Sequence, residues 1–136
     1  MRDLGVLSGG YSEARDINNK GQIVGHASLS GTVIHPVLWQ NGKITDLGTL
    51  GGDIGLGYGI NNGGQVVGDA DTSSGVRHAF LWQNGTITDL NSLLPANSGW
   101  ELTTAQDINN TGQIVGSGKF NGLDRAFLLT PTWVSH

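Results

Sequence analysis

The sequence of 136 residues contains no cysteine, only three prolines and only 13% charged side chains. Without cysteine the chain has no disulfide bond, no thiolate nucleophile and no cysteine-based zinc site. Seven lysines and arginines against eleven aspartates and glutamates leave a net charge of −4, which makes nucleic acid a poor partner. No apolar stretch approaches the about 20 residues that a membrane-spanning helix needs, and the first residues lack the pattern of a secretion signal. We expect no membrane insertion.

What the sequence does contain is one unit written three times. The copies share the pattern Ile-Asn-Asn-x-Gly-Gln-(Ile/Val)-Val-Gly, which ends the ranges 16–25, 59–68 and 107–116. A second pattern, VLWQNGKITDLG at 37–48, returns as FLWQNGTITDLN at 80–91. The third version, FLLTPTWVSH at 127–136, lacks the Asn-Gly pair. We expect a single domain, 1–136, whose repeats run over about 3–45, 46–88 and 89–136.

Each repeat is expected to form four short antiparallel strands. The element from Asn18 to Gly21 is typical of a hairpin with a left-handed glycine, between strands near 12–17 and 22–28. Asn41-Gly42 and Asn84-Gly85 predict hairpins with type I′ turns, in which both central residues have positive φ. The segments between the turns are too short for helices. The predicted fold class is therefore all-β.

Alternation along the third strand of each repeat places large apolar side chains on both faces. One face takes Val37 and Trp39, and the other takes Leu38; the same pattern recurs at 80–82 and 127–129. Both faces are therefore expected to be covered, as in a β-propeller, where four-stranded antiparallel blades stack face to face. Three blades are too few to close a ring, so this fold requires oligomerisation, most simply a dimer with six blades. The alternative is a β-trefoil monomer, in which three four-stranded repeats close within one chain.

The repeat from 46 to 90, with DLGTLGG, INNGGQVVG and HAFLWQNGTITDL, resembles the bacterial HAF extracellular repeat, named for the triplet His78-Ala79-Phe80. The other two copies replace the triplet with HPV at 35–37 and RAF at 125–127. The stretches 89–116 and 126–131 resemble the C-terminal repeat of such proteins. The resemblance covers essentially the whole chain. It implies a β-repeat protein of extracellular or cell-surface location, and it favours a blade-like unit over a trefoil.

Several recurring polar residues are expected to act within the scaffold. Asp3, Asp46 and Asp89 precede leucine at the end of the fourth strand, where a carboxylate accepts backbone N–H groups of the following turn. His35 and His78 occupy equivalent positions and Arg125 takes the third. We expect each to donate a hydrogen bond to a neighbouring strand or carboxylate, and an anion-binding surface is the alternative. Arginine in the third copy weakens a metal site, so no metal and no cofactor are predicted.

Acid–base chemistry on a glycosidic bond needs two carboxylates about 5–10 Å apart. The candidates are Asp16 and Asp107, which hold equivalent positions, and Glu101. No serine lies in a nucleophile-elbow pattern, and no glycine-rich run has the form of a phosphate loop.

Aromatic residues outside the shared pattern are the candidates for binding a ligand. Trp39 and Trp82 recur and are expected to be core residues, each with a partner for its indole N–H. Trp100 and Trp133 break the repeat, and Tyr11 and Tyr58 are each expected to precede the first strand of their repeat, so these four could stack on a sugar ring.

The sequence therefore favours a non-catalytic β-repeat module that binds a ligand such as a glycan, or is structural, and that self-associates. The alternatives are a polysaccharide-acting enzyme with an Asp/Glu pair and a purely structural assembly or adhesion unit.

Overall fold

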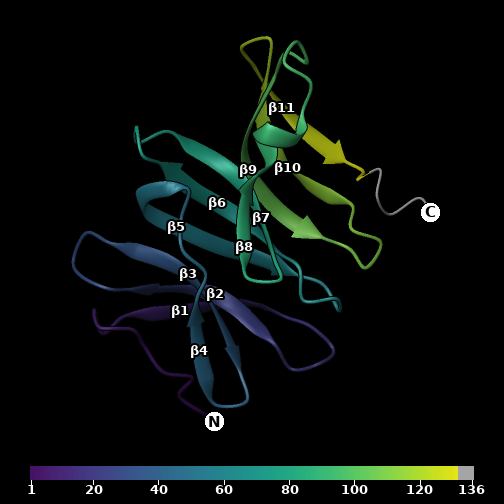
Figure 1. The fold of residues 1–136 in the computed structure, drawn as a ribbon. Coiled ribbons are helices and arrows are strands. Elements are labelled where there is room, and N and C mark those ends of the chain that lie inside the picture. Colours follow the sequence, from purple (N-terminus) through teal and green to yellow (C-terminus); the bar gives the residue numbers. More distant parts are fainter. Residues whose placement is uncertain (132–136) are drawn as a thin grey trace.

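The computed structural model describes residues 1–131, which form an all-β structure of three successive units (Figure 1). Unit 1 consists of β1 (Ser12–Ile17), β2 (Ile23–Ser28), β3 (Ile34–Gln40) and β4 (Lys43–Asp46). Unit 2 consists of β5 (Gly51–Ile60), β6 (Val66–Thr72), β7 (Arg77–Gln83) and β8 (Thr86–Asp89). A short 3-10 helix, η1 (Leu90–Leu93), leads to unit 3, with β9 (Trp100–Ile108), β10 (Ile114–Phe120) and β11 (Leu123–Leu129).

Within each unit every strand pairs antiparallel with the next one along the chain. Units 1 and 2 are joined by one parallel residue pair, Ile34 with Ile54, while unit 3 forms a separate sheet. Figure 1 shows unit 2 between unit 1, at the N-terminal end of the row, and unit 3. Among residues 1–131 no sheet closes on itself. The described part of unit 3 has three strands rather than the expected four, and Trp133 lies outside the described residues.

The predicted turns are present. Gly21 and its equivalents Gly64 and Gly112 have φ of 76°, 80° and 86°, and the N–H of each donates to the carbonyl of the first asparagine of its turn. Asn41 and Gly42 have φ of 55° and 77°, and Asn84 and Gly85 repeat these values within a few degrees, as a type I′ turn requires. A third such hairpin, Asn121-Gly122, joins β10 to β11 and was missed in the sequence.

The last glycine of each repeat pattern serves a β-bulge. The pairing of the first two strands of each unit shifts by one residue next to Gly25, Gly68 and Gly116. A Cβ atom on Gly68 would lie 1.9 Å from the carbonyl oxygen of Leu56, and the other two positions are equally closed. The bulge adds one residue to the first strand of the unit. A backbone carbonyl of that strand then occupies the space that a side chain at the glycine would need. Only glycine fits there, which explains why the pattern ends on it three times.

The core lies between the units. Val24 and Leu38 of unit 1 pack with Ile60 and Phe80 of unit 2, and the linker residue Leu47 is buried with them. The next cluster joins unit 2 to unit 3 in the same way, and it includes Val67, Leu81, Ile108 and Phe127. Burial of apolar area between stacked sheets supplies most of the stabilisation of such a row.

The expectation that both faces of the third strand are covered is confirmed for β3 and β7 and wrong for β11. Leu38 and Leu81 are 7% and 2% exposed, but the equivalent Leu128 is 61% exposed. The difference arises because no unit follows unit 3 within the described residues. Trp39 is buried as expected, although its indole N–H has no hydrogen-bond partner there.

Candidate functional site

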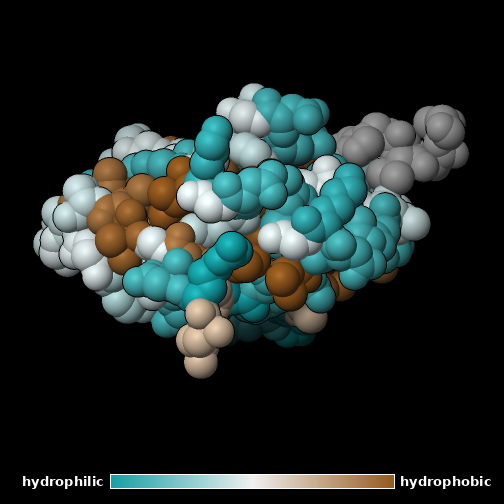
Figure 2. All heavy atoms as spheres, turned by 90° about the horizontal axis from the view of Figure 1, so that it is seen from below, coloured by the Kyte–Doolittle hydropathy of each residue, from teal (hydrophilic) through white to brown (hydrophobic). Residues whose placement is uncertain are grey.

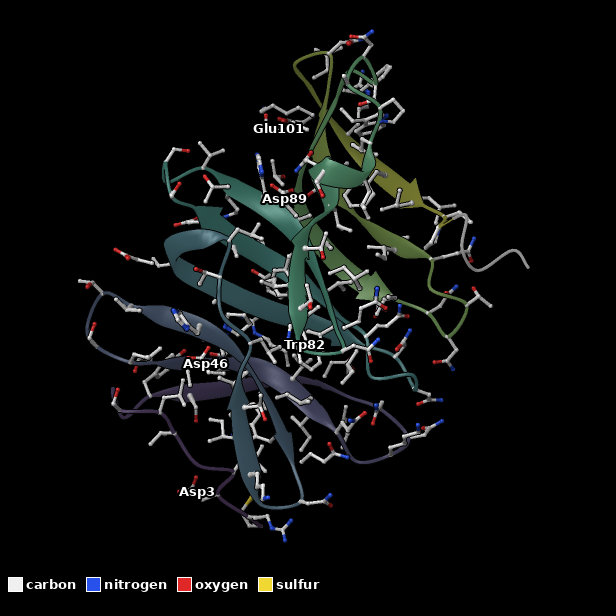
Figure 3. The ribbon with its side chains drawn as sticks, viewed as in Figure 1. Asp3, Asp46, Trp82, Asp89 and Glu101 are labelled. Atoms are coloured by element: carbon white, nitrogen blue, oxygen red, sulfur yellow. The ribbon has the colours of Figure 1, made fainter. Side chains whose placement is uncertain are left out.

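The carboxylates Asp3, Asp46 and Asp89 occupy equivalent places along the row of units, as Figure 3 shows. Each accepts the backbone N–H of the residue two positions later, at 2.9 Å. Two histidines, one in β3 and one in β7, contact two of these carboxylates. Nδ1 of His35 lies 2.8 Å from Asp46, and Nδ1 of His78 lies 2.6 Å from Asp89. Both predictions for these residues are confirmed. The pairs hold the third strand of units 1 and 2 to the turn after the fourth strand.

The histidine of unit 2 also contacts unit 3. Nε2 of His78 lies 3.4 Å from Glu101, which places the candidate acid of the sequence analysis in a bridge between two units. Arg125, the third member of the position, is exposed and donates to the carbonyl of Asp124, its neighbour in the sequence. The expected bond to a neighbouring strand or carboxylate is therefore not present for Arg125 among residues 1–131.

The asparagine pairs of the three turns form a ladder that runs through all units. Nδ2 of Asn18 donates to the carbonyl of Asn61 at 2.9 Å, and Nδ2 of Asn61 donates to the carbonyl of Asn109 at 3.0 Å. The second asparagine of each turn repeats the arrangement: the N–H of Asn19 donates to Oδ1 of Asn62, and the N–H of Asn62 donates to Oδ1 of Asn110. The sequence indicated turn formation only. The ladder was missed, because it appears only when the units are stacked in register.

An aspartate takes part in the same junctions. Asp16 accepts the N–H of Ile17 through Oδ1 and the N–H of Ile60, in the next unit, through Oδ2. Gly59 is the equivalent of Asp16 in unit 2, and a Cβ atom there would lie 3.0 Å from Oδ1 of Asp107. Asp107 itself accepts the N–H of Ile108. Asp16 and Asp107 therefore belong to two different junctions, and Gly59 is the residue opposite in both.

The ladder stops at both ends of the row. At unit 3, no group in residues 1–131 accepts the backbone N–H of Asn110, and Nδ2 of Asn109 donates only to its own turn residue Gln113. At unit 1, the carbonyl of Asn18 accepts only the N–H of Gly21, and Oδ1 of Asn19 accepts from nothing in the described chain. One end therefore offers two donors, and the other end offers the two acceptors that such donors meet inside the row.

Apolar side chains show the same difference between inner and outer positions. Val115 of unit 3 is 44% exposed, whereas its equivalents Val24 and Val67 are fully buried. Ile17 of unit 1 is 61% exposed, whereas its equivalents Ile60 and Ile108 are each 5% exposed. The same side chain at equivalent positions is buried where a neighbouring unit covers it and exposed where none does. We define the uncovered faces as end face 3, with Val115, Leu128, Asp107, Asn109 and Asn110, and end face 1, with Ile17, Asn18, Asn19, Leu4 and Leu7.

Both end faces are hollowed. A depression of about 200 Å³ on unit 3 is lined by Val115, Leu128 and the turn residues beside them. One of about 150 Å³ on unit 1 is lined by Ile23, Trp39 and the N-terminal segment. Figure 2 views the molecule from the side of unit 1 and shows hydrophobic atoms in patches between hydrophilic ones.

A polar cluster lies between units 2 and 3. Asp69 of β6 is only 2% exposed, accepts a hydrogen bond from Thr104 at 3.1 Å, and lies 4.0 Å from the guanidinium of Arg77. Burial raises the pKa of Asp69 above the ordinary carboxyl value, and the positive charge of Arg77 opposes that rise. Burial, followed by the charge of Asp69, also raises the pKa of Tyr58. The guanidinium of Arg15 stacks 5.3 Å from the centroid of the Tyr58 ring.

A second polar cluster lies within unit 1. Tyr11 donates to Glu13 at 3.0 Å, and its hydroxyl lies 3.4 Å from Nε2 of the buried His26. This bond to Glu13 raises the pKa of Tyr11. Burial lowers the pKa of His26, whose Nδ1 has no partner among the described residues.

The aromatic ligand candidates are placed in separate parts of the chain. Trp100 is half-buried and packs its ring against Phe120 and Phe127, at centroid distances of 5.1 and 6.4 Å. Tyr11 belongs to the cluster of unit 1, and Tyr58 is stacked with Arg15. Figure 3 shows Glu101 near Asp89, away from Asp3 at the other end of the row.

In residues 1–131 no three side chains of the metal-binding types form a group that could hold an ion. The described helix is far too short and polar to cross a membrane.

Comparison of the chain with protein-family models, with curated proteins and with solved structures gave no match. The functional argument therefore depends on the geometry above.

Proposed function

We propose that this chain is a non-catalytic structural module that self-associates through its end faces, and that two copies complete a propeller-like ring of six units. As part of this proposal, the three units are repeats of the HAF type, which the sequence from 46 to 90 resembles. The observation that carries the proposal is the contrast between inner and outer positions: Val115 and Leu128 are exposed while their equivalents in units 1 and 2 are buried. Exposed apolar patches of this kind on a soluble protein are typical of contact surfaces.

The use of the carboxylates supports a structural role over a catalytic one. Asp16 holds two backbone N–H groups, Glu101 bridges to His78, and Asp107 accepts the N–H of Ile108. Each of these groups is committed to a junction or a turn. A glycosidase would instead direct two of them at one open cleft.

The proposal is tested by the mass of the protein in solution, measured by light scattering during size exclusion over a wide range of loading concentrations. We expect a species of twice the chain mass of 14.2 kDa, in exchange with the monomer on dilution. A mass of one chain at every concentration up to the millimolar range would contradict the proposal. Hydrolysis of a polysaccharide that is lost on Asp16→Asn and Asp107→Asn would favour the enzyme instead.

Glycan binding stays a prediction of the sequence. Screening on a glycan array tests it, and Trp100→Ala separates a direct role from the packing of Trp100 on Phe120 and Phe127.

A further inference from the structure

We propose that end face 3 of one copy docks on end face 1 of a second copy, head to tail, in the same register that joins units 1, 2 and 3 within the chain. This inference depends on the proposed function, and it adds the residues that form the contact and the orientation of the partner. The occupant of each end face is a second copy of the chain. Inside the row, the face equivalent to end face 3 always packs on the face equivalent to end face 1.

The asparagine ladder fixes the register. Inside the row the first asparagine of a turn donates to the carbonyl of its equivalent, and the second donates its N–H to the side-chain oxygen of its equivalent. Continued by one step, Nδ2 of Asn109 meets the carbonyl of Asn18 of the second copy. The N–H of Asn110 likewise meets Oδ1 of Asn19 of the second copy. Every donor left over at one end thus has an acceptor at the other.

The apolar contacts follow the same register. Inside the row Val24 and Leu38 pack on Ile60, and Val67 and Leu81 pack on Ile108. In the new junction Val115 and Leu128 would cover Ile17 of the second copy, which is 61% exposed in the single chain.

The N-terminal segment is already placed for this junction. Leu4 and Leu7 pack on Ala27, Val37 and Trp39, as the linker residue Leu47 packs between units 1 and 2. The turn around Asp3 has the same hydrogen bond to the following N–H as the turn around Asp46. End face 1 therefore has the lining that the two inner junctions have.

A rival contact would pair the outer edges of the sheets. Strand β11 has an edge that no described strand covers, but it carries Asp124 and Arg125, and β4 begins and ends with Lys43 and Asp46. Charged side chains on an edge strand oppose such pairing. The edges offer no matched set of donors and acceptors like the ladder, so we favour the faces.

One difference between the new junction and the inner ones concerns an aspartate. Inside the row an aspartate always faces a glycine, Asp16 with Gly59 and then Gly59 with Asp107. In the new junction Asp107 would face Asp16 of the second copy. Because a Cβ atom at Gly59 would already lie 3.0 Å from Asp107 Oδ1, two aspartates there both crowd and repel each other. The junction between copies should therefore be weaker than the inner junctions, and Asp107→Gly should strengthen it.

The experiment uses sedimentation velocity on the full chain, with three variants at exposed positions. Leu128→Asp disables end face 3 and Ile17→Asp disables end face 1. Leu123→Asp is the matched control, because Leu123 lies on the same strand as Leu128, is 56% exposed, and is outside both end faces. Circular dichroism checks that each variant keeps the β-sheet structure.

We expect Leu128→Asp and Ile17→Asp each to raise the dissociation constant at least about tenfold, while Leu123→Asp changes it less than about twofold. The two disabled variants, once mixed, should associate one to one, because each still has the end face that the other lacks. Asp107→Gly should lower the dissociation constant about tenfold or more.

The outcomes separate this inference from the proposed function. If wild-type protein associates but the mixture of Leu128→Asp and Ile17→Asp stays monomeric, or if both variants associate as the wild type does, the head-to-tail junction is wrong and self-association stands. If Asp107→Gly weakens association, the register is wrong. If the wild type never associates, the inference and the proposed function fall together, and the end faces would have to meet further repeats of a longer chain.

Discussion

Replacement of Gly68 by alanine tests the account of the β-bulge. Gly68 is buried in β6, where the pairing with β5 shifts by one residue. An added Cβ would lie 1.9 Å from the carbonyl oxygen of Leu56 and 3.0 Å from the ring of Phe80. The first neighbour is backbone and the second belongs to a fully buried side chain, so neither can move without disturbing the core.

The expected cost follows from these distances. Forcing one extra carbon into a packed interior costs about 1–3 kcal/mol and occasionally more, and the backbone clash places Gly68→Ala at the upper end. Alanine also restricts the unfolded chain, which offsets about 0.4–1 kcal/mol of that cost. The net loss in the free energy of unfolding should be about 2–3 kcal/mol. For a chain of this length, that loss lowers Tm by about 10 °C.

Gly31→Ala is the matched control, because Gly31 is exposed and a Cβ atom there would have no neighbour within 4 Å. It should leave stability unchanged or raise it by up to about 1 kcal/mol. Both variants are compared with the wild type by urea denaturation and by thermal melting followed by circular dichroism. If Gly68→Ala melts within about 2 °C of Gly31→Ala, the reasoning from the bulge is refuted.

Three further predictions concern burial and charge. Val67→Ala should cost about 2 kcal/mol of unfolding free energy because Val67 is fully buried, while Val115→Ala, at the equivalent uncovered position, should cost less than about 0.5 kcal/mol in dilute protein, both measured by urea denaturation. Burial raises the pKa of Asp69, so the folded state holds this proton more tightly, and stability should fall as the pH rises above about 3.8 and through the raised folded value. Asp69→Asn should remove this fall from the curve of Tm against pH. Burial lowers the pKa of His26, so the folded state binds fewer protons, and stability should be lost as the pH falls below about 6.5; His26→Gln should flatten that part of the curve.

Each of these has a result that would contradict it. Equal losses for Val67→Ala and Val115→Ala would mean that the end face is covered in the monomer. A Tm curve of Asp69→Asn that runs parallel to the wild type above pH 4 would show that this carboxyl keeps its ordinary affinity for the proton. The same parallel course for His26→Gln below pH 6.5 would show that burial does not disfavour the charged imidazole.

Features that depend on neighbours within one hairpin could be predicted from the sequence. The Asn-Gly pairs fix their own turn type, because both residues must take positive φ. For His35 and His78 the sequence predicted a bond to a neighbouring strand or carboxylate without naming the partner. The register of β3 with β4 and of β7 with β8 brings these histidines to Asp46 and Asp89, each 11 residues later in the same hairpin. In these cases a short loop fixes the register of two adjacent strands, and the register decides which residues of the hairpin meet.

Features that depend on two units in contact could not be predicted. The ladder from Asn18 to Asn109 and the bridge between His78 and Glu101 join residues of different units. The sequence offers many asparagines for a turn, and nothing in it shows which amides face the next unit. Leu128 illustrates the same limit, because its own strand pattern equals that of Leu38 and only the missing neighbour exposes it.

The sequence by itself determined three repeats, most of their strands and turns, and the all-β class, because short-range conformational preferences and alternation act within each repeat. Only the tertiary structure decided how the repeats stack, which donors and acceptors each junction uses, and which two faces are left uncovered. Stacking is a relation between surfaces far apart in the sequence, so it depends on the summed fit of side chains from two sheets rather than on any local pattern.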